Sequence, residues 1–310
     1  MNTPLVLAFA PIWALTGLGY LGRRYQLLPP SSASVLSRFV FQLAMPVALF
    51  LTVSKTGFDR PHQSAAISFA IGALAVGAIA YLVSGRVFGR DRGERAMASM
   101  LGGYVNSANL GLPVAAYVLR DTSFLLEVLI MQVMIMTPLV LAFLDHATTP
   151  GRSINWRRMA TLPLRNPIII GAGLGALWSA AGWTVPELMT TALKPLAEAA
   201  VPTALVALGA SLVAAPGNSA ARTEVAVLTA VKSLLHPLIV FLVGRYAFGL
   251  HTHELLAAVV CAALPTAQNT FIIATEYRVL PDLANRVVVA STAVSMLVLG
   301  LVALWLGGLH

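Results

Sequence analysis

Charged side chains are scarce in this chain, and their scarcity excludes a soluble globular protein. Only 10% of the 310 residues are Asp, Glu, Lys or Arg, whereas 58% are hydrophobic and the mean hydropathy is +0.81. Soluble domains carry about 25% charged residues. The composition therefore predicts an integral membrane protein.

Cysteine is nearly absent as well. The one thiol, Cys261, cannot form an intrachain disulfide or a thiolate metal cluster, and we interpret it as a small apolar filler in a helix. The sequence also contains no nucleophile elbow, phosphate-binding loop, metal-ligand spacing or pair of catalytic carboxylates. We therefore expect no enzyme activity, no metal and no cofactor.

Long apolar runs dominate what is present. Each is near the roughly 20 residues that a helix needs to cross a bilayer. Ten such segments lie at about residues 4–22, 33–53, 65–88, 96–119, 122–144, 166–183, 190–213, 224–248, 254–275 and 284–307. This pattern predicts ten transmembrane helices.

Most arginines lie in loops that follow odd-numbered segments, such as the loops that contain Arg23 and Arg24 or Arg90 and Arg92. By the positive-inside rule these loops are cytoplasmic, so both termini lie outside the cell inner (plasma) membrane. Because the formal net charge of +8 is divided among many loops, we expect no nucleic-acid partner.

Residues 11–51 align without a gap with residues 167–207. The matched Gly and Pro pairs are Pro11 with Pro167, Gly17 with Gly173, Gly19 with Gly175, Pro30 with Pro186, and Pro46 with Pro202. Helix-distorting residues that match at one fixed spacing indicate two copies of one backbone design. Residues 1–144 and 166–310 are then two five-helix repeats, joined by a cytoplasmic linker over 145–165. Because five is odd, the repeats are inverted, which is typical of secondary transporters.

The fourth and ninth apolar segments contain residues that interrupt helices. The fourth reads GGYVNSANLGLP over 102–113, and the ninth reads LPTAQNT over 264–270. Proline has no N–H to donate, so backbone groups are freed at membrane depth and must line a polar cavity or contact protein. We predict breaks at Gly111, Pro113 and Pro265.

Amide side chains lie beside these breaks. Asn106, Asn109, Gln268 and Asn269 can each donate and accept hydrogen bonds, and half-helix N-termini attract anions. We predict that they bind a carboxylate, with Thr266 shaping the pocket. The alternative is that the amides only satisfy the kinked backbone.

Three ionisable residues inside the segments are candidate charge or proton sites. Lys232 and His236 lie one turn apart, where they could attract an anion or carry a proton. The alternative is that neither has a role in transport, and that the lysine only extends its charge toward the membrane surface while the histidine is hydrogen-bonded. For Glu127, near the interface, we favour a hydrated side chain over a proton site. Lys194 and Glu198 are expected to form a local salt bridge. With few acids inside the membrane, we expect uniport or proton-linked transport ahead of sodium symport.

The run Asn-x-x-Asn-x-Gly-x-Pro from Asn106 to Pro113, the run from Pro265 to Asn269 and the ten-segment repeat resemble the auxin efflux carrier family over the whole chain. That family includes bacterial malonate or malate permeases and plant auxin exporters. The resemblance implies a transport domain of helices 3–5 and 8–10, in which broken helices 4 and 9 cross. It also implies a scaffold of helices 1, 2, 6 and 7, and a homodimer.

The sequence therefore predicts an all-α secondary transporter of two inverted repeats that moves a small organic anion across the lipid bilayer by an elevator-like motion. Malonate, malate and an auxin-like indole acid all remain open as substrates. A sodium-coupled symporter of the bile-acid type and a membrane sensor that binds a metabolite without moving it are the alternatives.

Overall fold

The computed structural model describes residues 5–56, 63–148, 166–213 and 222–307. Within these ranges the chain is helical apart from turns, short connections and one isolated β-bridge. Most of the expected linker, residues 149–165, lies outside the described residues.

The first half contains helices with several short π-helical segments, labelled η. Their bounds are α1 Leu5–Arg24, α2 Ser32–Phe39, η1 Val40–Ala44, α3 Met45–Thr56, α4 Gln63–Arg86, α5 Arg92–Gly103, η2 Ser107–Gly111, α6 Leu112–Val114, η3 Ala115–Leu119, α7 Ser123–Met131, η4 Gln132–Met136 and α8 Thr137–Thr148.

The second half also consists of α-helices with short π-helical segments. Its elements are α10 Pro167–Ala180, α11 Glu187–Ser211, α12 Arg222–Ala230, η7 Val231–Leu235, α13 His236–Leu242, η8 Val243–Ala247, α14 Thr252–Ala263, α15 Gln268–Tyr277 and α16 Pro281–Gly307.

Several helical stretches are long and apolar enough to cross a membrane. Six are found among the described residues, namely Ser32–Lys55, Gln63–Arg86, Ser123–Leu144, Glu187–Ser211, Arg222–Ala247 and Pro281–Val302. Shorter apolar helices cover Ser107–Leu119, Pro167–Ala180 and His253–Ala263. The chain is thus an all-helical, multi-pass membrane protein.

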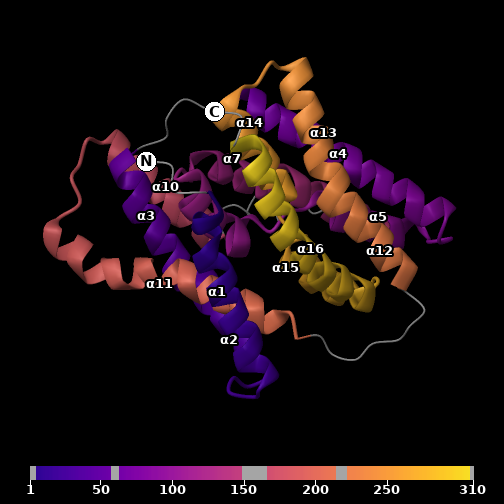
Figure 1. The fold of residues 1–310 in the computed structure, drawn as a ribbon, viewed down its shortest axis with the longest axis horizontal. Helices are drawn as coiled ribbons and strands as arrows, with labels where there is room; N and C mark the ends of the chain where they lie inside the picture. Colours follow the sequence, from indigo (N-terminus) through magenta and orange to yellow (C-terminus); the bar gives the residue numbers. More distant parts are fainter. Residues whose placement is uncertain (1–4, 57–62, 149–165, 214–221, 308–310) are drawn as a thin grey trace.

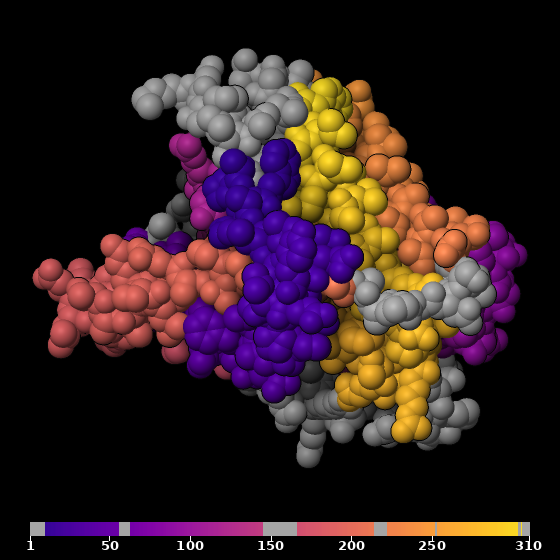
Figure 2. Space-filling model, turned by 60° about the horizontal axis from the view of Figure 1, so that its bottom comes forward, coloured from indigo at the N-terminus to yellow at the C-terminus, as the bar shows by residue number. Residues whose placement is uncertain are grey.

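The helices form two groups that lie side by side. Helices α1, α3, α10 and α11 gather on one side in Figure 1, and α4, α5, α12 and α13 gather on the other, with α15 and α16 between them. In Figure 2 the salmon segment of α10 and α11 projects beside the indigo N-terminal helices, and the yellow C-terminal helix separates these from the orange ones.

Four of the π-helical segments end two residues before a proline. Pro46, Pro113, Pro138 and Pro237 follow η1, η2, η4 and η7 in this way. In each case the residue that precedes the proline donates its N–H to the carbonyl five residues back, as Leu112 does to Ser107. Proline lacks an N–H and its ring displaces the carbonyl one turn back, so the wider turn lets the helix continue through it.

Backbone-to-backbone contact joins α1 to α11 and α10 to α3. A Cβ added to Gly19 would collide with the backbone of Val206, and one added to Gly175 would collide with the backbone of Phe50. The same sequence spacing separates Gly19 from Gly175 and Phe50 from Val206. The two helix pairs therefore make equivalent close contacts.

Gly19→Ala is expected to lower stability by about 1–3 kcal/mol, because the added methyl group has no space against Val206. Gly17→Ala, two residues earlier in α1, is the matched control, since nothing lies within 4 Å of a Cβ at that position. Alanine favours a helix over glycine by about 1 kcal/mol, so the control should be neutral or stabilising. Thermal unfolding of the purified variants in detergent measures both, and equal melting temperatures would contradict the close packing.

Candidate functional site

The two interrupted helical segments meet at their interruptions. Helix α5 ends at Gly103 and α14 ends at Ala263, and short extended stretches follow each. Val105 and Thr266 form an isolated antiparallel bridge. The N–H of Asn106 donates to the carbonyl of Pro265 at 2.8 Å, and that of Ala267 donates to the carbonyl of Tyr104 at 3.1 Å. Each interruption thus satisfies backbone groups that the other leaves free.

The interruption in the first of these segments lies earlier than the sequence predicted. Tyr104, Val105 and Asn106 are non-helical, whereas Gly111 ends η2 and Pro113 lies within α6. The expected break at Gly111 and Pro113 is therefore misplaced, because the π-helical turn of η2 absorbs the proline. Pro265 does lie in the non-helical stretch of its segment.

Thr266 does not shape a pocket. Its side chain is fully buried, and its hydroxyl donates to the carbonyl of Leu101 at 2.8 Å, while its N–H donates to Ser291 Oγ at 3.1 Å. Ala267 lines the pocket beside the crossing, and Thr266 is not among its lining residues. The hydrogen bonds of Thr266 hold the crossing in place.

Amide side chains connect the two segments across the crossing. Asn109 Nδ2 donates to Gln268 Oε1 at 2.8 Å, and Gln268 Nε2 lies 3.4 Å from Ser211 Oγ at the end of α11. The Oδ1 atom of Asn106 accepts the N–H of Asn109 at 3.2 Å and caps η2. The structure thus brings together three of the predicted amides.

One buried amide donor at this place is unsatisfied. Asn106 is 3% exposed, and its Nδ2 has no hydrogen-bond partner among the described residues. Asn269, the fourth predicted amide, is exposed and lines the same pocket as Asn106. An unpaired buried donor is costly, and this one belongs to a residue that lines a cavity.

A cavity of about 470 Å³ borders the crossing. Its lining combines the crossing residues with α2 and η1, the junction of α7 with η4, the N-cap of α10, the end of α11 and the early turns of α16. Polar lining residues include Ser34, Ser37, Arg38, Gln42, Tyr104, Asn106, Ser107, Asn109, Gln132, Asn166, Ser211, Gln268, Asn269 and Asn285. Among its described lining residues, Arg38 carries the one formal charge and no carboxylate is present. The cavity therefore combines polar side chains and one positive charge with a largely apolar surface.

The sequence analysis missed Gln132 as a site residue. This side chain is 1% exposed, donates to the carbonyl of Val105 at 2.9 Å and accepts the hydroxyl of Ser107 at 2.7 Å. Gln132 thus fixes the non-helical stretch around Val105 and also lines the cavity. A lone amide in the otherwise apolar segment 122–144 was the available signal.

Lys232 and His236 do not line this cavity. Both are fully buried, and Lys232 Nζ lies 2.8 Å from His236 Nδ1 and donates to the carbonyl of Ala262 at 3.0 Å. Ala262 is in the last turn of α14, where carbonyls lack helical partners and the helix dipole is negative. The pair therefore lies behind the crossing, at the carbonyl end of α14. Glu127, half-buried in α7, is also outside the cavity lining.

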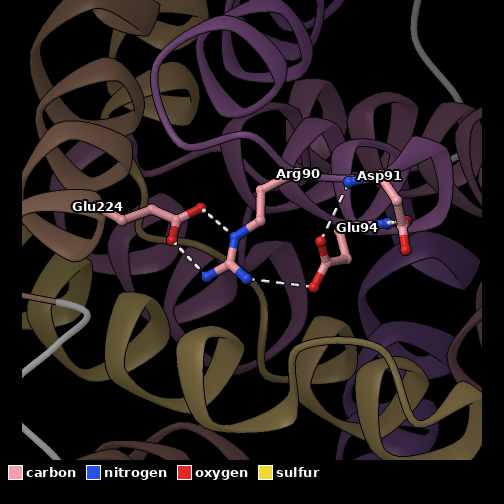
Figure 3. Close-up of polar contacts among 4 residues, drawn as sticks. All are labelled: Arg90, Asp91, Glu94 and Glu224. Carbon is pink, nitrogen blue, oxygen red and sulfur yellow. Dashed lines mark hydrogen bonds and ion pairs between the residues drawn. The ribbon is translucent and has the colours of Figure 1, made fainter.

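Glu224 is a buried acid that the sequence analysis did not weigh. It is 3% exposed in the first turn of α12, and Arg90 binds it through two hydrogen bonds of 2.7 and 3.2 Å (Figure 3). Arg90 also donates to Glu94 at 3.2 Å, and Glu94 forms a capping box with Asp91 at the start of α5. The hydrogen bonds to Glu224 raise the pKa of the Arg90 guanidinium above its ordinary value. An acid at the start of a predicted span, with an arginine in a loop on the same side, was the available signal.

Known proteins resemble this chain over its length. Residues 4–303 match the family described as membrane transport protein. The chain is 27% identical over 291 residues to "Putative malonate transporter" of Rhizobium meliloti (strain 1021), which covers 92% of this chain and 91% of that protein. It is 26% identical over 294 residues to "Uncharacterized transporter YfdV" of Escherichia coli (strain K12), covering 93% and 91% respectively. It is 20% identical over 349 aligned positions to "Auxin efflux carrier component 8" of Arabidopsis thaliana, covering 94% of each.

Proposed function

The chain belongs to the membrane transport protein family that contains the auxin efflux carriers, and from this premise we propose that it is a secondary transporter for a small carboxylate anion. The observation that carries the proposal is the unpaired, buried amide of Asn106 beside a cavity that no described carboxylate lines. The substrate carboxylate accepts hydrogen bonds from Asn106, Asn109 and Asn269 at this crossing.

Helix ends supply the second part of the anion site. The segment Ser107–Leu119 and helix α15 both begin at the cavity, since their N-cap residues Asn106 and Ala267 line it. The first N–H groups of a helix lack intrahelical acceptors, and the helix dipole makes this end positive. Two such ends beside one cavity favour an anion at the crossing.

The size of the cavity fits a small organic acid. Ligand sites have volumes of about 300–1,000 Å³, and this cavity has about 470 Å³. The relative named for malonate covers nearly the whole chain, which favours a short carboxylate of that kind. Malate and an auxin-like indole acid are the further substrates that the family favours.

The transport cycle that we propose uses two inverted five-helix repeats and an elevator-like movement. The matched glycine contacts of α1 with α11 and of α10 with α3 support the repeat and a rigid scaffold of these helices. A second group of helices would move with the crossing. In this group α4 packs against α5, α13 packs against α14, and α16 packs against α12, α14 and α15. In this proposal the termini lie outside the plasma membrane, so the cavity faces the cytoplasm.

We further propose uniport or proton-linked transport in preference to sodium symport. Sodium sites in carriers need oxygen ligands, and the buried acid Glu224 is engaged by Arg90 at the edge of α12. Lys232 Nζ donates to the carbonyl of Ala262 at the carbonyl end of α14, at a distance of 3.0 Å. A hydrogen-bond donor there satisfies a carbonyl that a bound cation would otherwise coordinate.

Uptake by the purified protein in proteoliposomes tests the proposal. Labelled malonate, malate, propionate and indole-3-acetate are offered with and without sodium, and with and without a pH gradient. We expect saturable uptake of at least one carboxylate, unchanged when choline replaces sodium. Binding without accumulation would favour the sensor, sodium-dependent uptake would favour the symporter, and no interaction with any of these acids would end the proposal.

A further inference from the structure

One cation among the described lining residues of the cavity has no role in the site as described so far. Arg38 lies in the last turn of α2, is exposed, and lines the cavity that the crossing amides also line. The sequence analysis treated it only as one of the positive charges at the cytoplasmic ends of helices. No described carboxylate lines the cavity, so no acid there competes for the guanidinium.

The repeat provides a built-in comparison for this arginine. The alignment that pairs Gly19 with Gly175 also pairs Arg38 with Lys194 and Gln42 with Glu198. Lys194 Nζ lies 3.7 Å from Glu198 Oε1, and neither residue lines the cavity. Beside Arg38 the corresponding position holds the neutral Gln42, which does line the cavity. Lys194 therefore has an acid one turn away, whereas Arg38 has an amide at the equivalent place.

We propose that Arg38 binds the second carboxylate of a dicarboxylate whose first carboxylate lies at the crossing amides. This inference rests on the proposed function and specifies its substrate class. Guanidinium binds a carboxylate through two parallel hydrogen bonds, and Ser34, Ser37 and Gln42 on the same helical stretch offer further polar contacts. The unpaired Asn106 Nδ2 marks the other end of the site.

The two ends of this site come from different stretches of the chain. Arg38 lies on α2, whereas Asn106 and Asn109 lie at the start of the segment after α5, and both stretches contact α11. A dicarboxylate therefore bridges these two stretches in the conformation seen here, and a monocarboxylate contacts only the crossing. Arg38 is in this sense a specificity residue for dianions.

Equilibrium binding of malonate and of propionate to the full-length protein in detergent tests this proposal. These acids share their length and one carboxylate, and differ in the second. We expect Arg38→Gln to weaken malonate binding about tenfold or more, as the loss of a charge-assisted contact does, and to change propionate binding less than about threefold. Arg38→Lys should retain part of the malonate preference, since the charge remains and the paired geometry is lost.

Two further variants separate the possible outcomes. Lys194→Gln, at the repeat-related position outside the cavity, should leave both affinities unchanged, and Asn109→Ala should weaken both. If Arg38→Gln weakens both acids equally or neither, while the native protein binds them, this inference is wrong and the proposed function stands. If the native protein binds neither acid, this inference fails, and the uptake of malate and indole-3-acetate described above decides the proposed function.

Discussion

Replacing Arg90 with methionine is expected to lower the free energy of unfolding by about 3 kcal/mol or more, because the Glu224 carboxylate is then left buried without its counter-charge. Glu224 is 3% exposed, and two of its hydrogen bonds come from Arg90. Removing one partner of a buried ion pair typically costs about 3–5 kcal/mol. The partial exposure of the Arg90 side chain, 27%, places our expectation at the lower end.

Arg92→Met is the matched control for this variant. Arg92 is an exposed arginine two residues away in the first turn of α5, and its loss should cost less than about 0.5 kcal/mol. Replacing both members of the pair, as in Arg90→Met with Glu224→Leu, should be less destabilising than Arg90→Met alone, since no unpaired charge remains. Chemical or thermal unfolding in detergent measures all three. A double variant that is less stable than Arg90→Met would show that the pair contributes by itself.

Asn109→Asp is expected to abolish carboxylate uptake, with a loss of at least about 100-fold, although the two side chains have nearly the same shape. Two like charges about 4 Å apart repel by about 4 kcal/mol at the effective dielectric constant of about 20 near a protein surface. Gln268 can turn its amide and donate to the new carboxylate, so the contact across the crossing is retained. The fold should therefore persist while the anion site is lost.

Asn109→Ala should give a smaller loss of about 10- to 100-fold, because it removes a donor without adding a charge. Asn166→Asp is the control for charge alone. Asn166 lines the same cavity but caps α10, where aspartate caps equally well. Initial uptake rates in proteoliposomes rank the three variants. If Asn166→Asp and Asn109→Asp lose the same activity, the carboxylate does not bind at the crossing.

Periodicity and residue chemistry predict the larger features of this molecule. The apolar segments identify a multi-pass helical protein, and the four-residue spacing of Lys232 and His236 predicts the shared face on which their nitrogens lie 2.8 Å apart. The amides beside the interruptions also lie together at one crossing, as the contact of Asn109 with Gln268 shows. These features depend on local spacing, which the sequence displays directly.

The features that sequence reasoning missed depend on details of backbone path. Pro113 lies in a continuing helix because a π-helical turn precedes it, and Thr266 is buried where it bonds to Leu101 and Ser291. Glu224 and Arg90 are 134 positions apart, so only the packing of α12 beside α5 brings them together. Arg38 resembles any cytoplasmic arginine until the cavity beside it is seen.

The close glycine contacts of α1 with α11 and of α10 with α3 also have a mechanical meaning. Packed helices slide past one another in small steps when interlocked side chains exchange rotamers. Where one backbone rests directly on another, as at Gly19 and Val206, there are no rotamers to exchange, and any displacement would open a gap or force a collision. Such a contact holds the two helices rigidly together. Any movement between helices must therefore take place at interfaces that are packed through side chains.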